Sequence, residues 1–255
     1  MRQTRSDGTD LLTTEELSKY FIGVRALDSV NITLEKGEIT LLLGPNGSGK
    51  TTLISTITGF HKADRGRVIL EGRDITNLPP HQIYNLGITR TFQIPRPLKR
   101  MTVLENLMIG VKSSGDGIWG SFRRKWLEEE DETIERAFNL LEFLGLKRLA
   151  HHPASDLSGG ESKLLELGRA LMPDTKLLIM DEPLAGIAPQ LAEKLLNRLR
   201  EIKELGIGLL LIEHRLDLVL PYADKIYVMA EGKIIAKGDE EVLDEPSVLE
   251  AYLGA

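Results

Sequence analysis

The chain's 255 residues are 42% hydrophobic, enough for one sizeable core, and their net charge of -6 argues against a broad nucleic-acid-binding surface, which needs a basic face. The absence of cysteine excludes disulfides and thiolate metal sites, and the polar first ten residues contain no secretory signal. Because no apolar stretch approaches the roughly 20 residues needed to span a bilayer, we expect a protein that does not enter a membrane by itself, and the lack of cysteine fits a cytosolic location.

The first third of the chain alternates strand signals with turns. Residues 28–34 lead through the turn at 36–38 into the apolar run 39–43, which predicts a hairpin that enters a core strand. A helix is expected from Lys50 to near Gly59, and residues 66–75 predict further strands.

The middle of the chain has a helical pattern. Residues 101–108 are helix-like, 113–120 form a loop rich in glycine and serine, and a charged helix is expected over about 128–144 with Gly145 as its C-cap. We interpret about 93–172 as a helical subdomain inserted in an α/β core.

The remainder alternates as parallel-sheet units do. The expected elements are a strand at 177–180, a helix at 189–205, a strand at 209–212, a helix at 216–222 and a closing hairpin of 226–229 with 233–236. We therefore expect a single domain over 10–255, with its core at about 10–92 and 173–255 and a flexible N-terminus at 1–9.

A phosphate-binding motif directly follows the apolar run 39–43. It reads GPNGSGKT, a glycine, four variable residues and Gly-Lys-Thr. Glycines let backbone N–H groups turn toward phosphates, and the following helix adds the positive end of its dipole. Lys50 is expected to hold the β and γ phosphates of a nucleoside triphosphate, and Thr51 a magnesium ion. The expected nucleotide contacts are Gly44, Pro45, Asn46, Gly47, Ser48, Gly49, Lys50, Thr51 and Thr52.

An apolar strand further along ends in two acids, in the sequence LLIMDE at 177–182. Phosphoryl transfer to water needs charge neutralisation, a metal and a positioned nucleophile. Asp181 is therefore expected to bind magnesium, directly or through water. Taken alone, the acid pair would serve equally well as a helix N-cap.

The order of five motifs identifies a family. The phosphate loop, the TFQ that ends at Gln93, the LSGGE at 157–161, the acidic strand end and the IEH at 212–214 resemble, in this order, the ATP-binding subunit of ABC transporters. The resemblance covers nearly the whole chain. It implies ATP and Mg2+ as cofactors and an α/β fold: a RecA-like P-loop NTPase core with a mostly parallel sheet, an antiparallel β region and an inserted helical subdomain.

The same resemblance implies roles for single residues. Glu182 matches the family's catalytic base, which polarises the attacking water, and His214 matches the histidine that senses the γ phosphate. Gln93 matches the glutamine that contacts the metal and the water and moves with the membrane partner. An aromatic side chain before Ala26 is expected to stack on adenine; Phe21 is favoured by spacing, with Tyr20 as the alternative and a core role open for either.

The LSGGE motif points to a second chain. Ser158, Gly159 and Gly160 begin a helix that runs to Leu171, so hydroxyl and backbone donors lie at its positive end. The resemblance implies that this end faces the γ phosphate bound by a second copy; a merely capped helix is the alternative. Glu161 belongs to the same contact set but replaces the family's usual glutamine, and Ala188 replaces an aspartate that crosses the dimer interface.

The transporter class is suggested by the segment after Gln93, by an insertion over 111–127 and by the C-terminal EAYLG. These resemble the larger ATPase subunit of branched-chain amino acid importers. The resemblance implies that the partners are permease subunits, a second ATP-binding subunit and, indirectly, a substrate-binding protein, and that nucleic acid is not a partner. It also implies a location at the cytoplasmic face of the membrane. Trp119, Phe122 and Trp126 are either core residues or contacts to the membrane subunit. The alternatives are a lipopolysaccharide-export ATPase and a nucleotide sensor or ATPase unconnected with transport.

Overall fold

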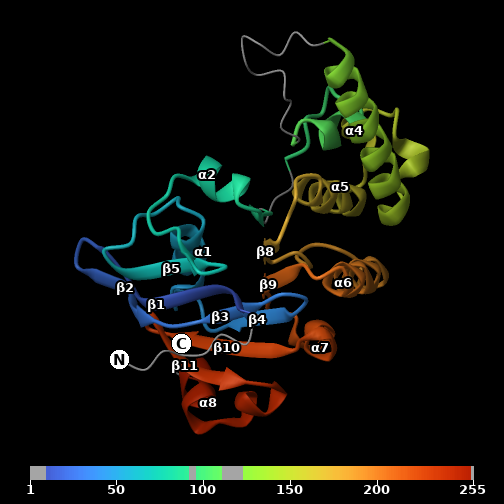
Figure 1. Cartoon of the computed structure of the whole chain (residues 1–255). Coiled ribbons are helices and arrows are strands. Elements are labelled where there is room, and N and C mark those ends of the chain that lie inside the picture. The colour runs from blue at the N-terminus through green and yellow to red at the C-terminus, as the bar shows by residue number, and fades with distance from the viewer. Residues whose placement is uncertain (1–9, 92–95, 111–122, 254–255) are drawn as a thin grey trace.

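A computed structural model of the chain describes residues 10–91, 96–110 and 123–253 (Figure 1). The largest sheet has six strands in the order β11-β10-β4-β9-β8-β7. Its strands are β4 (Ile39–Leu43), β7 (Ile88–Arg90), β8 (Leu177–Asp181), β9 (Gly208–Ile212), β10 (Lys225–Ala230) and β11 (Lys233–Gly238). All neighbouring pairs are parallel except β10 with β11. Every residue of β4 and β9 is buried, as expected for central strands of a parallel sheet.

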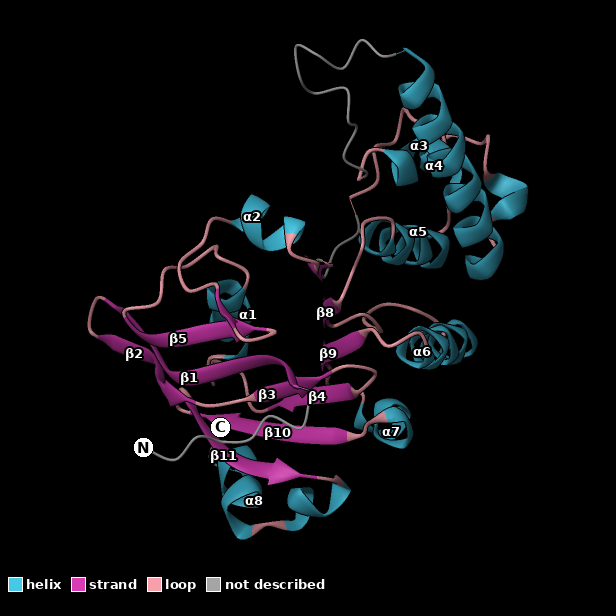
Figure 2. Ribbon diagram, in the orientation of Figure 1, coloured by secondary structure: helices cyan, strands magenta, loops and turns pink. Residues whose placement is uncertain are grey.

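Alternate residues of this sheet enter two separate cores. Leu41, Met180 and Leu211 pack on the side of helices α6 (Pro189–Glu204) and α7 (Leu216–Val219). Leu42 and Ile179 pack on the opposite side, against helix α1 (Lys50–Ile57) and a second sheet. Successive side chains of a strand point to opposite faces of the sheet, so each strand contributes to both cores and the structure is layered. Figure 2 shows helices α6 and α7 on one side of the central strands and the second sheet on the other.

The second sheet is antiparallel. It contains β1 (Asp10–Phe21), β2 (Val24–Val30), β3 (Thr33–Glu35), β5 (Arg65–Leu70) and β6 (Arg73–Asp74), in the order β2-β1-β5-β6 with β3 paired to β1. The strands predicted within 66–75 are confirmed. The predicted hairpin into the core strand is wrong, because β3 pairs with β1 while β4 pairs with β9 and β10. The turn at Gly37, with φ of 64°, instead carries the chain from one sheet to the other.

Three helices form the helical part in the middle of the chain: α3 (Val103–Met108), α4 (Arg123–Leu144) and α5 (Gly159–Leu171). They pack together at one side of the sheets (Figure 1). Helix α4 begins earlier than predicted but ends at the predicted residue, and Gly145 follows it with φ of 72°, as a helix C-cap requires. The expected loop 113–120, Trp119 and Phe122 lie outside the described residues, and the subdomain boundaries remain a prediction.

Helices α2 (Pro80–Asn85) and α8 (Pro246–Leu253), which the sequence analysis did not predict, are the remaining α-helices of the described residues. The helix expected at 216–222 is α-helical only to Val219 and continues as a 3-10 turn over Leu220–Tyr222. Further 3-10 turns lie at Lys147–Leu149, Ala154–Asp156 and Glu240–Asp244. Among the described helices, none combines the length and the apolar character that a bilayer crossing requires.

One tyrosine joins the two sheets. Tyr227 of β10 is fully buried, and its hydroxyl donates to the carbonyl oxygen of Thr33 at 3.1 Å while accepting from the Thr33 N–H at 2.9 Å. Thr33 belongs to β3, so these two hydrogen bonds connect the parallel sheet to the antiparallel sheet.

Tyr227→Phe is expected to lower the free energy of unfolding by about 1–2 kcal/mol, because two backbone groups of Thr33 lose their partner. Urea denaturation measures the loss. Tyr222→Phe is the control, since the Tyr222 hydroxyl makes a single 3.3 Å hydrogen bond to Asn197 at a partly exposed position. Equal losses in the two variants would contradict the proposed connection between the sheets.

Candidate nucleotide-binding site

The candidate site lies where three neighbouring parallel strands end. Strand β9 lies between β4 and β8, with Leu211 paired to Leu41 on one side and to Met180 on the other. The loop after β4 is the glycine-rich motif, β8 ends at Asp181, and β9 is followed by Glu213 and His214. The carboxyl ends of parallel strands form the usual ligand-binding edge of an open α/β sheet.

Glycine is required at two positions of the phosphate loop. Gly44 has φ of 145°, and a Cβ there would lie 2.1 Å from the carbonyl oxygen of Met229. Gly49 has φ of 107°, and its Cβ would lie 2.5 Å from the oxygen of Ala26. The loop therefore packs against β10 and β2 without side chains, and it delivers the chain directly into α1, whose first residue is Lys50. Backbone N–H groups at such a helix start favour a bound phosphate.

The Lys50 side chain lies back over this loop. It is 8% exposed, and its ammonium donates to the carbonyl oxygens of Gly44 at 2.7 Å and Pro45 at 2.9 Å. Burial lowers the pKa of Lys50, and the charges of Asp181 and Glu182 oppose that shift. The loop thus carries a partly desolvated cation facing two carboxylates from the neighbouring strand end.

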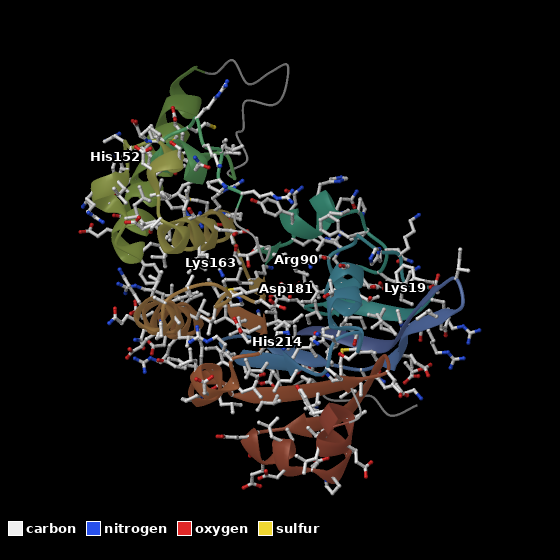
Figure 3. The ribbon with its side chains drawn as sticks, turned by 180° about the vertical axis from the view of Figure 1, so that it is seen from behind. Lys19, Arg90, His152, Lys163, Asp181 and His214 are labelled. Carbon is white, nitrogen blue, oxygen red and sulfur yellow. The ribbon has the colours of Figure 1, made fainter. Side chains whose placement is uncertain are left out.

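Asp181 has a cationic neighbour that the sequence analysis did not identify. The guanidinium of Arg90, at the end of β7, lies 3.3 Å from Asp181 Oδ2 and donates to Ser55 Oγ of α1 at 3.2 Å. Figure 3 shows Arg90 and Asp181 side by side near the centre of the molecule. Burial lowers the pKa of Arg90, whereas the charge of Asp181 raises it. Arg90 therefore orients the Asp181 carboxylate and compensates its charge.

Glu182 and His214 face each other across the ends of β8 and β9. His214 Nε2 lies 3.2 Å from Glu182 Oε1, and both side chains are partly exposed. Glu182 has φ of 50°, in the left-handed region that residues with a side chain rarely adopt. Its N–H still donates to the oxygen of Ile212 at 2.9 Å, so the strand pairing holds this unusual conformation. Such outliers are common at functional sites.

These groups line one pocket of about 380 Å³. Many of the lining residues are site residues that the sequence predicts, although the sequence does not show that they lie together. These are Asn46, Gly47, Ser48, Gly49, Lys50, Thr51, Thr52, Asp181, Glu182 and His214. The pocket also gathers residues that the sequence analysis missed: Val24, Arg25, Ala26, Ile212, Glu231 and Gly232. The Gly232 N–H donates to the oxygen of Ser48 at 2.9 Å, so the turn between β10 and β11 supports the loop.

The expected adenine contacts lie beside this pocket but do not line it. Phe21 is 43% exposed, and its ring meets the His61 ring edge-on at 5.3 Å. The guanidinium of Arg25 lies over the Tyr20 ring at 5.7 Å. A stacking role for Phe21 or Tyr20 stays a prediction. Gln93 lies outside the described residues.

The start of α5 forms a second, separate group. Ser158 caps the helix by accepting from the Glu161 N–H at 3.3 Å, and Glu161 accepts from the Ser158 N–H at 3.0 Å and its hydroxyl at 2.8 Å. These hydrogen bonds, with Arg148 nearby, lower the pKa of Glu161. Ser158 and Gly159 are exposed, and none of residues 158–161 lines the pocket. One chain therefore keeps its phosphate loop and its LSGGE motif apart.

Residues 27–185 match the family model described as "ABC transporter". The chain belongs to the ABC transporter family. It is 57% identical over 246 residues, 96% of each protein, to a "Probable branched-chain amino acid transport ATP-binding protein LivG" of Archaeoglobus fulgidus. It is 36% identical to a "High-affinity branched-chain amino acid transport ATP-binding protein LivG" of Escherichia coli K12, over 96% of this chain and 98% of that protein.

Solved ABC cassettes have the same fold. A nucleotide-free cassette is 52% identical and superposes with a TM-score of 0.85, covering 96% of this chain and all of the other. A cassette in its ADP conformation is 50% identical with a TM-score of 0.84, covering 96% of this chain and 99% of the other. The expected P-loop NTPase fold is thereby confirmed, and the chain is a nucleotide-binding ATPase cassette.

Lys50→Ala is expected to weaken ATP binding at least tenfold, about 1.4 kcal/mol, because it removes the cation from the phosphate loop. Titration with a fluorescent ATP analogue measures the affinity. Lys194→Ala, at an exposed position of α6, is the matched control and should bind as the wild type does. An affinity within about threefold of the wild type would contradict the assignment of Lys50.

Glu161→Gln is expected to leave ATPase activity within a few-fold of wild type. Glutamine also closes a capping box with serine, so the start of α5 should keep its geometry. Glu161→Ala keeps the Ser158 cap but removes the carboxylate that accepts from the Ser158 N–H and hydroxyl, so it is expected to be less stable by about 1 kcal/mol. Steady-state kinetics and thermal unfolding measure both. A tenfold drop in kcat/KM for Glu161→Gln would show instead that the charge is needed.

Proposed function

We propose that this chain binds and hydrolyses ATP as one of two paired cassettes that drive a membrane permease importing branched-chain amino acids. The observation that carries the proposal is the single pocket at the ends of β4, β8 and β9, which combines a phosphate loop with Lys50, two strand-end acids and a histidine. The transport class rests on relatives of that name that match over nearly their whole length.

The phosphates of ATP would lie on the loop over residues 44–52, with the β and γ groups at Lys50. Thr51 and Asp181 line the same pocket and offer a hydroxyl and a carboxylate oxygen, the donor type that magnesium prefers. These residues therefore fit a magnesium ion, with Gln93 as a further expected ligand. When bound, the metal neutralises charge on the β and γ phosphates.

Glu182 is the proposed general base. Glu182 lines the same pocket as Asp181, where its carboxylate can orient a water molecule toward the γ phosphate and accept its proton. His214, 3.2 Å from that carboxylate, holds it in place and can contact the γ phosphate with its imidazole. Both side chains are partly exposed, so a water molecule can reach them.

A second cassette completes the proposed site. The exposed N-terminus of α5 offers Ser158, Gly159 and Gly160 as anion-binding groups, yet they do not reach the pocket of their own chain. They suit the γ phosphate held by a second ATP-binding subunit, identical or related. Two chains arranged in this way would enclose two ATP molecules between them.

The further partners follow from the transport class: permease subunits that span the membrane and a protein that binds the transported amino acid. We place the chain at the cytoplasmic face of the membrane, attached through the permease. A role in lipopolysaccharide export, or as a nucleotide sensor outside transport, has less support because the relatives described above are named for branched-chain amino acid transport.

Glu182→Gln is expected to separate binding from turnover. The amide has nearly the shape of the carboxylate but cannot accept the proton of water, so hydrolysis should fall about 100-fold or more. Binding should persist, because Lys50, Thr51 and Asp181 remain. The unhydrolysed ATP should then hold two chains together, giving a dimer in ATP and a monomer in ADP by size-exclusion chromatography.

Ser158→Arg added to Glu182→Gln should restore the monomer in ATP, because a long cation blocks the start of α5. Retained nucleotide binding is the control for this double variant. If Glu182→Gln stays a monomer in saturating Mg-ATP with nucleotide bound, the paired arrangement is wrong and the chain acts as a solitary ATP-binding domain.

A further inference from the structure

Two side chains of opposite charge hold the backbone of the loop directly after Glu182. The ammonium of Lys163, from α5, donates to the carbonyl oxygens of Pro183 and Ala185. The carboxylate of Glu213 accepts from the N–H of Leu184. Three consecutive residues, the 183–185 loop, are thus held through their main chain by groups from two distant parts of the sequence.

These contacts lie in a dry environment. Glu213 is 4% exposed and Leu184 is fully buried. A buried carboxylate is costly unless it is hydrogen-bonded, and Glu213 accepts a second hydrogen bond from the His214 N–H at 3.1 Å. Burial lowers the pKa of Lys163, and the charges of Glu213, Glu166 and Glu182 oppose that shift. The Lys163 ammonium therefore belongs to the same charged cluster as Glu213 and the proposed general base.

The position of these residues in the chain connects the two halves of the proposed site. Lys163 lies on α5, less than two turns after Ser158. The 183–185 loop follows Glu182, and the Ala185 N–H closes a turn onto the Glu182 oxygen at 3.1 Å. Glu213 precedes His214. In Figure 3 the label of Lys163 lies beside α5, and those of Asp181 and His214 lie nearer the centre of the molecule.

A shift of α5 would therefore pull on the loop through these hydrogen bonds. The Lys163 ammonium is bound to the carbonyl groups of Pro183 and Ala185, and the loop is held on its other side by Glu213. Because the loop begins at Glu182, whose backbone is already in the left-handed region, a small displacement changes the direction of that carboxylate relative to His214.

We propose that Lys163, together with Glu213, is a positioning residue that couples the start of α5 to Glu182 within one chain, so that engagement of Ser158 to Gly160 by a second cassette aligns the general base. This inference rests on the proposed function. It assigns to the 183–185 loop a role in the rate of hydrolysis and not in the affinity for nucleotide, because neither Lys163 nor Glu213 lines the nucleotide pocket.

The first test compares Lys163→Met with Lys163→Arg. Methionine keeps the length of the side chain without its charge and should lower kcat about tenfold or more, while the affinity for ATP and KM change less than about twofold. Arginine can donate to both carbonyl groups and should restore kcat to within about threefold of the wild type. Lys147→Met, at an exposed lysine paired with Glu142 outside this cluster, is the matched control and should have wild-type kcat.

Hydrogen exchange supplies a readout that does not depend on activity. In Lys163→Met the amides of Leu184 and His214 should exchange faster, whereas amides of α1 should be unaffected. Glu213→Gln should lower kcat in the same way, and the double variant should lose less than the product of the two single losses, because both act on one loop.

The outcomes separate the inference from the function on which it rests. If the wild-type chain has no ATPase activity, the proposed function is wrong. If the wild type is active, any of three results would overturn the coupling role alone. These are a kcat of Lys163→Met within twofold of the wild type, equal losses of kcat in Lys163→Met and Lys163→Arg, and a KM that rises as much as kcat falls. Thermal unfolding is measured for each variant, and the assays are run well below its unfolding midpoint. A loss of kcat then cannot come from unfolded protein.

Discussion

The backbone hydrogen bonds that join β4, β9 and β8 in parallel fix the relation between the phosphate loop, the two acids and His214. Side chains alternate along a strand, so a shift of one residue in the pairing of β8 with β9 would send the apolar residues of one core to the other face. The side chains packed in the two apolar cores on either side of the sheet resist that shift, because their shapes would no longer fit. The geometry of the pocket therefore depends on packing well away from it.

Charge balance is the second condition that the site meets. Two cations flank two carboxylates across the strand ends: Lys50 lies on the loop, Asp181 ends β8 with Glu182 directly after it, and Arg90 ends β7. Each is partly desolvated, so removing one member leaves its neighbour with a less compensated charge. In the proposed complex the polyphosphate would lie at the cations and the metal at the carboxylates, so each charge that enters meets one of opposite sign.

The sequence predicts what depends on local pattern and misses what depends on distant contacts. The phosphate loop, the strands that end at Leu43 and Asp181, and the capped start of α5 each follow from a few adjacent residues. The hairpin into β4 was wrong, because local alternation cannot tell which sheet a strand joins. Strand β1 was not predicted at all, since its sequence does not alternate cleanly and its backbone is irregular at Glu16. Arg90, Lys163 and Glu213 carry no local signal, because Asp181, Pro183 and Leu184, the partners that define their roles, each lie 20 or more residues away along the chain.

The left-handed backbone at Glu182 lowers the stability of the folded protein. A glycine would adopt φ of 50° without the steric cost, on the order of 1 kcal/mol, that a side chain meets there. Glycine, however, has no carboxylate. Selection for a sturdier fold and selection for turnover therefore act in opposite directions at one residue, and a cassette of this kind that no longer needs to hydrolyse ATP would be free to lose its proposed base first.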